Sequence, residues 1–160
     1  MNARRRILAL LAGAAMLSCA FTGCSAQKQD PVTITIWTYY NGEQLESFNA
    51  EVKNFNDTVG KEKGITVESY SQGSVNDLEA NVMNAAEGKV GADPLPNIFS
   101  AYADTAYALD QMGMVVNLKD YLSDEECAEY IDSYLAEGDF DNSGSIKIFP
   151  VAKSTEVLFL

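Results

Sequence analysis

Residues 31–42, with the sequence PVTITIWTYYNG, combine the pattern of a β-strand with an abrupt aromatic ending. Val32, Ile34 and Ile36 alternate with threonines and Trp37, which is the period of a strand whose two faces have different surroundings. The run ends in aromatic residues and an Asn-Gly pair that is typical of a turn. Because open α/β folds bind ligands at the carboxyl ends of their strands, this stretch predicts a strand that presents aromatic side chains at a binding edge.

The rest of the chain alternates between helical and strand-like patterns. Apolar residues recur at helical spacing from Leu45 to Val59, and Gly60 is the predicted end of that helix. The remaining pattern predicts strands at 65–70, 97–100 and 146–150, helices that begin at Ser74 and span 104–112 and 123–138, a loop at 88–96 and a short extended piece at 114–118. This alternation favours an α/β fold with a largely parallel sheet.

Two of the predicted helices begin with a capping pair. Ser74 is followed three residues later by Asp77, and Ser123 is followed at the same spacing by Glu126. In such pairs the serine oxygen accepts a hydrogen bond from a backbone N–H of the first turn, and the acidic side chain reaches back toward the serine. The two pairs therefore predict where these helices start.

The first residues have the features of a secretory signal. Residues 1–6 are basic, residues 7–17 form an apolar run that is short for a bilayer span, and small residues follow. Residues 21–24 (FTGC) resemble the lipobox of bacterial lipoproteins, which implies that Cys24 is the lipidated first residue of the mature protein, with Cys19 as the rival position. An ordinary cleaved signal and an uncleaved anchor are the other interpretations.

We therefore expect three parts in the chain. Residues 1–23 are the predicted lipoprotein signal peptide, residues 24–31 a polar tether, and residues 32–160 the folded lobe. Several acyl chains on Cys24 would hold the protein on the membrane while the folded part stays in water. The expected location is the extracellular face of the cell membrane, with the membrane contacted through the lipid anchor.

The charge of the chain is strongly acidic, with 11 Lys+Arg against 23 Asp+Glu and a formal net charge of −12. Such a surface repels phosphate backbones, which excludes nucleic acid as a partner. All three arginines lie within residues 4–6, so the predicted lobe lacks the planar fork that usually grips carboxylates and phosphates, and an anionic ligand is disfavoured. The sequence contains no histidine, which excludes Ser-His-Asp and Cys-His catalysis and any His-ligated metal within these residues.

Residues 139–145 (DFDNSGS) reproduce the first half of an EF-hand loop. Oxygen-bearing side chains occupy its first, third and fifth positions, and Gly144 occupies the sixth. The last position is Pro150 instead of the bidentate glutamate that supplies the strongest ligand. An acidic turn is therefore the preferred interpretation, and no metal ligands are assigned. A calcium-dependent surface adhesion module is the weaker alternative that rests on this loop.

Four aromatic residues fall at the predicted carboxyl ends of strands rather than along helix stripes: Trp37, Tyr39, Tyr40 and Tyr102. Flat apolar rings with a polar tip stack on the C–H faces of sugars, and neighbouring amide and hydroxyl side chains supply directional hydrogen bonds. For Trp37 the interpretations of core residue and cleft residue stay equally open. Tyr39 and Tyr40 are the stronger candidates for the cleft.

These residues resemble the extracellular solute-binding lipoproteins of bacterial ABC importers, specifically the large sugar-binding type related to maltose-binding protein. The resemblance covers nearly the whole chain. It rests on the order and spacing of 34–37 (ITIW), Phe48 and Phe55, 64–67 (GITV), 96–99 (PNIF), 106–108 (AYA) leading to Gly113, and 148–152 (IFPVA). It implies two α/β lobes that are joined by a hinge and close over a ligand, in a chain more than twice this length. We therefore expect the amino-terminal lobe, with a mostly parallel sheet flanked by helices, truncated where the chain crosses the hinge.

The same resemblance places the ligand cleft at the strand ends. It implies as ligand-binding residues Tyr39, Tyr40 and Asn41 after the first strand, Gln72 after the second, Tyr102 and Asp104 after the third, and Lys153, Ser154 and Thr155 after Pro150. The expected function is capture of an uncharged solute, an oligosaccharide within that class, and its presentation to ABC permease subunits. No cofactor is implied.

A secreted α/β enzyme of the hydrolase type is the alternative from another functional class. It would need a nucleophile with an adjacent base, and the sequence lacks both histidine and a Gly-x-Ser-x-Gly elbow. We therefore expect a binding protein rather than an enzyme.

Overall fold

The computed structural model describes residues 30–152 of the chain. Contacts divide the chain after Pro31, and the unit that begins at Val32 is the one described below. The predicted signal with Cys19 and Cys24, and the predicted ligand residues Lys153, Ser154 and Thr155, lie outside the described residues. None of the helices within 30–152 has the length and apolar character needed to cross a membrane.

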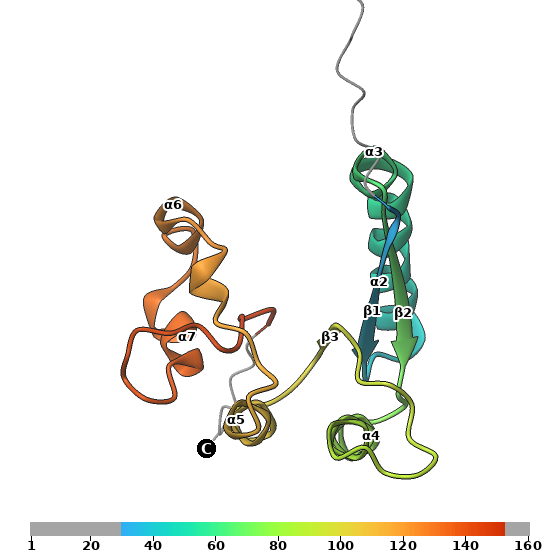
Figure 1. Ribbon diagram of the computed structural model, residues 1–160. Helices are drawn as coiled ribbons and strands as arrows, with labels where there is room; N and C mark the ends of the chain where they lie inside the picture. Colours follow the sequence, from blue (N-terminus) through green and yellow to red (C-terminus); the bar gives the residue numbers. More distant parts are fainter. Residues whose placement is uncertain (1–29, 153–160) are drawn as a thin grey trace, which may run out of the picture. The chain divides into compact units, whose positions relative to one another are not determined.

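Three parallel strands form the sheet, in the order β2-β1-β3. They are β1 (Val32–Thr38), β2 (Ile65–Ser71) and β3 (Ile98–Phe99). Trp37 is paired with Tyr70 on one side and with Phe99 on the other. Figure 1 shows β1 and β2 side by side with their carboxyl ends at the same edge. The predicted parallel α/β arrangement is confirmed, and β3 is shorter than the predicted strand at 97–100.

A helix of fourteen residues, α2 (Gly42–Phe55), follows β1 and lies alongside the sheet (Figure 1). The prediction that it ends at Gly60 is wrong. The helical path continues through a π-helical turn (Asn56–Gly60) and a short helix, α3 (Lys61–Lys63). It ends at Gly64, which has φ 71°. Gly60 has helical dihedrals, and a Cβ there would lie 2.5 Å from the carbonyl oxygen of Ile65. Its missing side chain therefore serves close packing, while Gly64 takes the left-handed conformation that ends helices.

Helices α4 (Val75–Ala86) and α5 (Ala103–Gln111) flank β3 in sequence, and residues between α4 and β3 form the predicted loop. The Ser74 cap is confirmed, because its hydroxyl oxygen accepts a hydrogen bond from the Asp77 amide at 3.2 Å. The core combines the side chains of Trp37, Leu78, Val82 and Leu109, which are 6%, 1%, 0% and 0% exposed. Burying each of these side chains contributes roughly 1.5–3 kcal/mol to stability.

The predicted helix at 123–138 is interrupted. Ser123 and Glu126 form the predicted capping box and start α6 (Asp124–Cys127), but α7 (Asp132–Leu135) and a 3-10 turn (Ala136–Gly138) are separate elements. The chain leaves the helical path near Tyr130, whose ring packs edge-on against Phe149 at 4.6 Å between centroids. A tertiary contact with a residue far along the sequence thus overrides the local helical pattern.

The predicted strand at 146–150 and the predicted extended piece at 114–118 form no ladder. A 3-10 turn occupies Leu118–Asp120, and residues 145–152 have no regular structure. The Leu118 amide donates to the Ile146 carbonyl at 2.8 Å, and the Lys147 amide donates to the Gly138 carbonyl at 3.0 Å. These are individual backbone hydrogen bonds to turn residues and not part of a strand ladder, so this stretch stays outside the sheet.

Candidate functional site

The segments that follow the three strands meet at one edge of the sheet because the strands are parallel. Two short hydrogen bonds tie the segment after β1 to the end of β2. The backbone amide of Gln72 donates to the Thr38 carbonyl at 2.7 Å, and the Ser71 hydroxyl donates to the Tyr40 carbonyl at 2.7 Å. The structure therefore holds the predicted residues of the first two strand ends against each other.

Three tyrosines lie at this edge. The rings of Tyr39 and Tyr40 pack edge-to-face with centroids 5.3 Å apart, and Tyr40 makes the same kind of contact with Phe48 of α2. Burial, followed by electrostatic interaction with Tyr40 and then Tyr102, raises the pKa of Tyr39 above its ordinary value. Like any tyrosine hydroxyl, that of Tyr39 can both donate and accept a hydrogen bond. Tyr102 is 62% exposed, which leaves most of its ring available to a ligand.

The predicted ligand residue Asn41 acts as a brace between two strand ends. Its side-chain amide donates to the Tyr39 carbonyl at 2.9 Å and also to the Gly73 carbonyl. Both amide hydrogens are therefore used within the protein, and its side-chain oxygen is the group left for a ligand. Gln72 is arranged in the opposite way, because its side-chain oxygen accepts a hydrogen bond from Asn81 of α4 at 2.8 Å while its amide hydrogens stay available.

Asp104 lies in the first turn of α5, two residues after Tyr102, which is the residue that precedes the helix. The Asp104 carboxylate accepts a hydrogen bond from the Thr105 amide at 2.8 Å, and the residue is exposed. A carboxylate at a helix amino terminus is favoured by the helix dipole, so Asp104 has a local structural role in the absence of any ligand.

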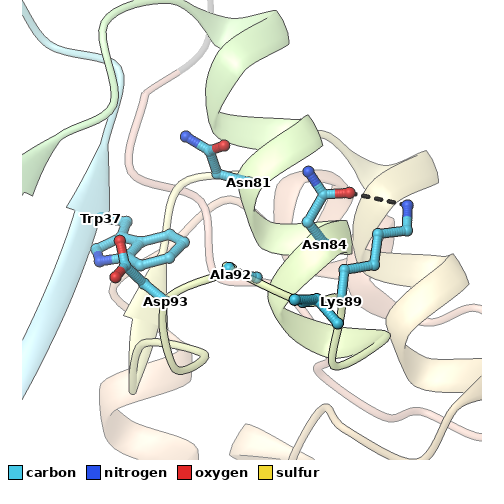
Figure 2. A pocket seen from close by; sticks show the side chains of 8 residues that line it. Trp37, Asn81, Asn84, Lys89, Ala92 and Asp93 are labelled. Atoms are coloured by element: carbon cyan, nitrogen blue, oxygen red, sulfur yellow. Dashed lines mark hydrogen bonds between the residues drawn. The ribbon is translucent and has the colours of Figure 1, made fainter.

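Trp37 is only 6% exposed and packs in the core cluster. It also forms one wall of a hollow of about 260 Å³ that is lined in addition by residues of α4 and of the loop after it. The other lining residues are Asn81, Asn84, Lys89, Val90, Gly91, Ala92 and Asp93. Figure 2 shows the two asparagines on α4 and the remaining residues on the loop that follows it. Sequence reasoning missed this hollow, although asparagines three residues apart on a helix, followed by a glycine-containing loop, were a usable signal.

The acidic loop 139–145 is closed by its own backbone. The Asp139 carboxylate accepts hydrogen bonds from the amides of Ser143 and Gly144, both at 3.0 Å, and the Asp141 carboxylate accepts from Ser143 at 3.1 Å. Hydrogen bonds from Ser143 lower the pKa of Asp141. Within residues 30–152 no group of three or more Cys, Asp or Glu side chains could hold a metal ion. The hydrogen bonds of Asp139 and Asp141 to backbone amides close an acidic turn, which is the interpretation that the sequence favours over a calcium loop.

Solved structures with a similar fold are solute-binding proteins. The cyclic alpha-maltosyl-1,6-maltose binding protein of Arthrobacter globiformis matches with a TM-score of 0.58 and 20% identity over 69% of this chain. A family 1 extracellular solute-binding protein of Bifidobacterium longum subsp. infantis matches with a TM-score of 0.53 and 14% identity over 74%. A third structure, a binding protein with mannotriose bound, matches with a TM-score of 0.51 and 18% identity over 72%. At these identities the comparison defines the fold, an α/β lobe of the solute-binding type.

The model of the bacterial extracellular solute-binding protein family matches residues 50–160, and the chain belongs to that family. The family and the three solved neighbours are binding proteins rather than enzymes. The present chain spans 26%, 27% and 27% of the lengths of the three solved chains. No curated protein matches the sequence.

Proposed function

We propose that this chain belongs to the substrate-binding component of an ABC importer and captures an uncharged oligosaccharide outside the membrane. The observation that carries the proposal is the meeting of Tyr39, Tyr40 and Tyr102 with two amide side chains at the carboxyl edge of a parallel sheet. Aromatic rings of this kind stack on sugar faces, and amides bind hydroxyl groups. Membership of the solute-binding family supports the same conclusion.

The charge of the described residues favours a neutral ligand. Residues 30–152 contain no arginine or histidine, and acidic side chains outnumber lysines. The ligands named for two of the solved neighbours are cyclic alpha-maltosyl-1,6-maltose and mannotriose, which are both neutral oligosaccharides. We infer the same class for this chain, with Tyr39, Tyr40, Asn41, Gln72, Tyr102 and Asp104, and also Lys153, Ser154 and Thr155, as contributors to the binding site.

The proposed partners and location follow from this role. Permease subunits of the importer would receive the solute, and closure of a second lobe over the edge would bury it. The family is extracellular, and we propose that Cys24 carries a lipid anchor, with residues 1–23 as the signal peptide and residues 24–31 as the tether. Substituting Cys24→Ser should release the protein from the membrane fraction. A protein that stays membrane-bound without Cys24 would contradict the proposed anchor position.

We propose that the chain has no catalytic role. Incubation of the purified protein with oligosaccharides that it binds should leave them intact, because the residues of the site that the structure describes offer hydrogen-bonding and stacking groups. Release of shorter sugars would favour the hydrolase alternative.

A thermal-shift survey of the full-length protein tests the proposed ligand class. Ligands that bind only the folded state raise the melting temperature by mass action. Neutral oligosaccharides should raise it in a concentration-dependent way, whereas amino acids, short peptides and polyamines should leave it unchanged. The opposite pattern would contradict the carbohydrate assignment.

A further inference from the structure

The hollow beside Trp37 carries side chains of a kind that suits a polyhydroxyl ligand. Asn84 uses its side-chain oxygen to accept from the Lys89 ammonium at 2.8 Å, so its amide hydrogens stay available (Figure 2). Asn81 uses one amide hydrogen on Gln72, so its side-chain oxygen stays available. Asp93 makes no hydrogen bond or ion pair within residues 30–152 and offers two acceptor oxygens. The hollow thus presents donors and acceptors together.

Ionised side chains of both signs lie at the hollow. Lys89 and Asp93 are the ionised residues of its lining, and Lys89 is also paired with Glu87, outside the lining, at 2.9 Å. A hydroxyl group can donate to the Asp93 carboxylate and accept from an amide N–H of the lining. A neutral polyhydroxyl ligand can therefore use both kinds of group.

The size of the hollow restricts the ligand further. Its volume of about 260 Å³ is below the range of roughly 300–1,000 Å³ that is usual for sites of drug-sized ligands. Trp37 closes it from β1, and Gly91 leaves open space where a side chain would stand, because nothing lies within 4 Å of a Cβ built there. This volume suits a group no larger than one sugar ring.

Two contacts connect the hollow with the proposed ligand site. Asn81, in its wall, is hydrogen-bonded to Gln72 at the end of β2. Tyr39 packs against the buried cluster that contains Trp37. The hollow is therefore connected with the edge of the sheet where Tyr39, Tyr40 and Tyr102 lie, called the tyrosine edge below.

We propose that this hollow is an additional subsite, which binds one further sugar ring of an oligosaccharide whose other rings lie at the tyrosine edge. Asp93, Asn84 and Asn81 would bind its hydroxyl groups, and Trp37, which is 6% exposed, would form part of the wall. The proposal of this subsite rests on the proposed function, because the subsite extends the proposed ligand site. Affinity would then depend on the length of the oligosaccharide.

Calorimetric titration of the full-length protein with malto-oligosaccharides and manno-oligosaccharides, from disaccharide to pentasaccharide, tests the proposal. Affinity should rise once the sugar is long enough to enter the hollow. Asp93→Ala removes the acceptor, and Ala92→Phe fills the space. Each should weaken binding of the longer sugars by about threefold to tenfold and leave the shortest bound sugar unchanged. Glu62→Ala removes an exposed carboxylate from α3 and is the matched control, which should change neither.

The outcomes separate the subsite from the function on which it rests. If both variants keep the wild-type length dependence and melting temperature, or weaken all lengths equally, the subsite is refuted while sugar binding stands. If the wild-type protein gives no heat with any sugar of either series, the subsite and the proposed oligosaccharide specificity both fall.

Discussion

The side chain of Asn56 binds the backbone of Val67 through two hydrogen bonds of 2.8 Å, one accepted from the Val67 amide and one donated to its carbonyl. Asn56 stands at the start of the π-helical turn, and Val67 lies in the edge strand β2. The side-chain amide of Asn56 thus makes the two hydrogen bonds that a neighbouring strand would make with Val67. This contact satisfies the backbone N–H and C=O of Val67 at the outer edge of the sheet. It thereby prevents another chain from pairing with β2 at Val67.

Asn56→Ala should lower the free energy of unfolding by about 1–3 kcal/mol, because two backbone groups lose their partners. Urea denaturation followed by circular dichroism measures this change. Asn54→Ala is the matched control, since Asn54 is exposed at the end of α2, two residues before Asn56, and it should change stability by less than about 0.5 kcal/mol. Equal stability of the two variants would show that water replaces the Asn56 side chain without cost.

Thr38 is 1% exposed, and its hydroxyl oxygen has no hydrogen-bond partner among the described residues. Thr38→Val keeps the shape and removes the unsatisfied group, so it should stabilise the protein by about 1–2 kcal/mol. The Thr35 hydroxyl, by contrast, is bonded to both the amide and the side chain of Asn97. Thr35→Val in the same strand should therefore destabilise. Denaturant midpoints of the two variants that shift in the same direction would contradict this distinction.

Hydrogen bonds from Ser123, first from its backbone amide at 2.8 Å and then from its hydroxyl, lower the pKa of Glu126 below its ordinary value. The folded state therefore favours the carboxylate. Its stabilising effect is complete above the unfolded pKa and is lost as the pH falls through the folded pKa.

Ser123→Ala should move the pKa of Glu126 part of the way back toward its ordinary value, because only the hydroxyl is removed. Carboxyl-carbon NMR during an acid titration measures this directly. Ser133→Ala, an exposed serine in α7, is the control and should leave the pKa of Glu126 unchanged. An unchanged pKa in the Ser123 variant would mean that the backbone amide alone is responsible.

Tyr102→Ala should reduce the affinity for a neutral oligosaccharide by about tenfold without changing the melting temperature, since an exposed ring that stacks on a ligand contributes little to the fold. Tyr121 is 76% exposed and follows the 3-10 turn Leu118–Asp120 rather than a strand, so Tyr121→Ala is the control for the loss of a surface ring. Titration calorimetry of both variants provides the test. Equal affinities would remove Tyr102 from the binding site.

The elements that the sequence predicted well are those with local signals. The strand predicted from residues 31–37 and the pairing of Ser74 with Asp77 need only neighbours within a few positions, and both are confirmed. Burial along β1 rises toward its carboxyl end instead of alternating between the two faces. The helix end was misplaced because Gly60 and Gly64 are both plausible stops. The choice between them depends on how closely Gly60 packs against Ile65.

The failures share one physical cause, which is contact between distant residues. The ring contact of Tyr130 with Phe149 breaks a helix that the local pattern supports. Topology predicted that Asn41 would lie at the strand-end edge, but not that its amide would brace the Gly73 carbonyl. The hollow beside Trp37 combines a strand, a helix and a loop, so its lining could not be assembled from periodicity alone.

Isothermal titration calorimetry of the full-length protein with neutral oligosaccharides tests the central claim most directly. The account predicts saturable heat at one-to-one stoichiometry with at least one oligosaccharide and no heat with peptides or polyamines. Heat with peptides or polyamines and none with any glycan would contradict it.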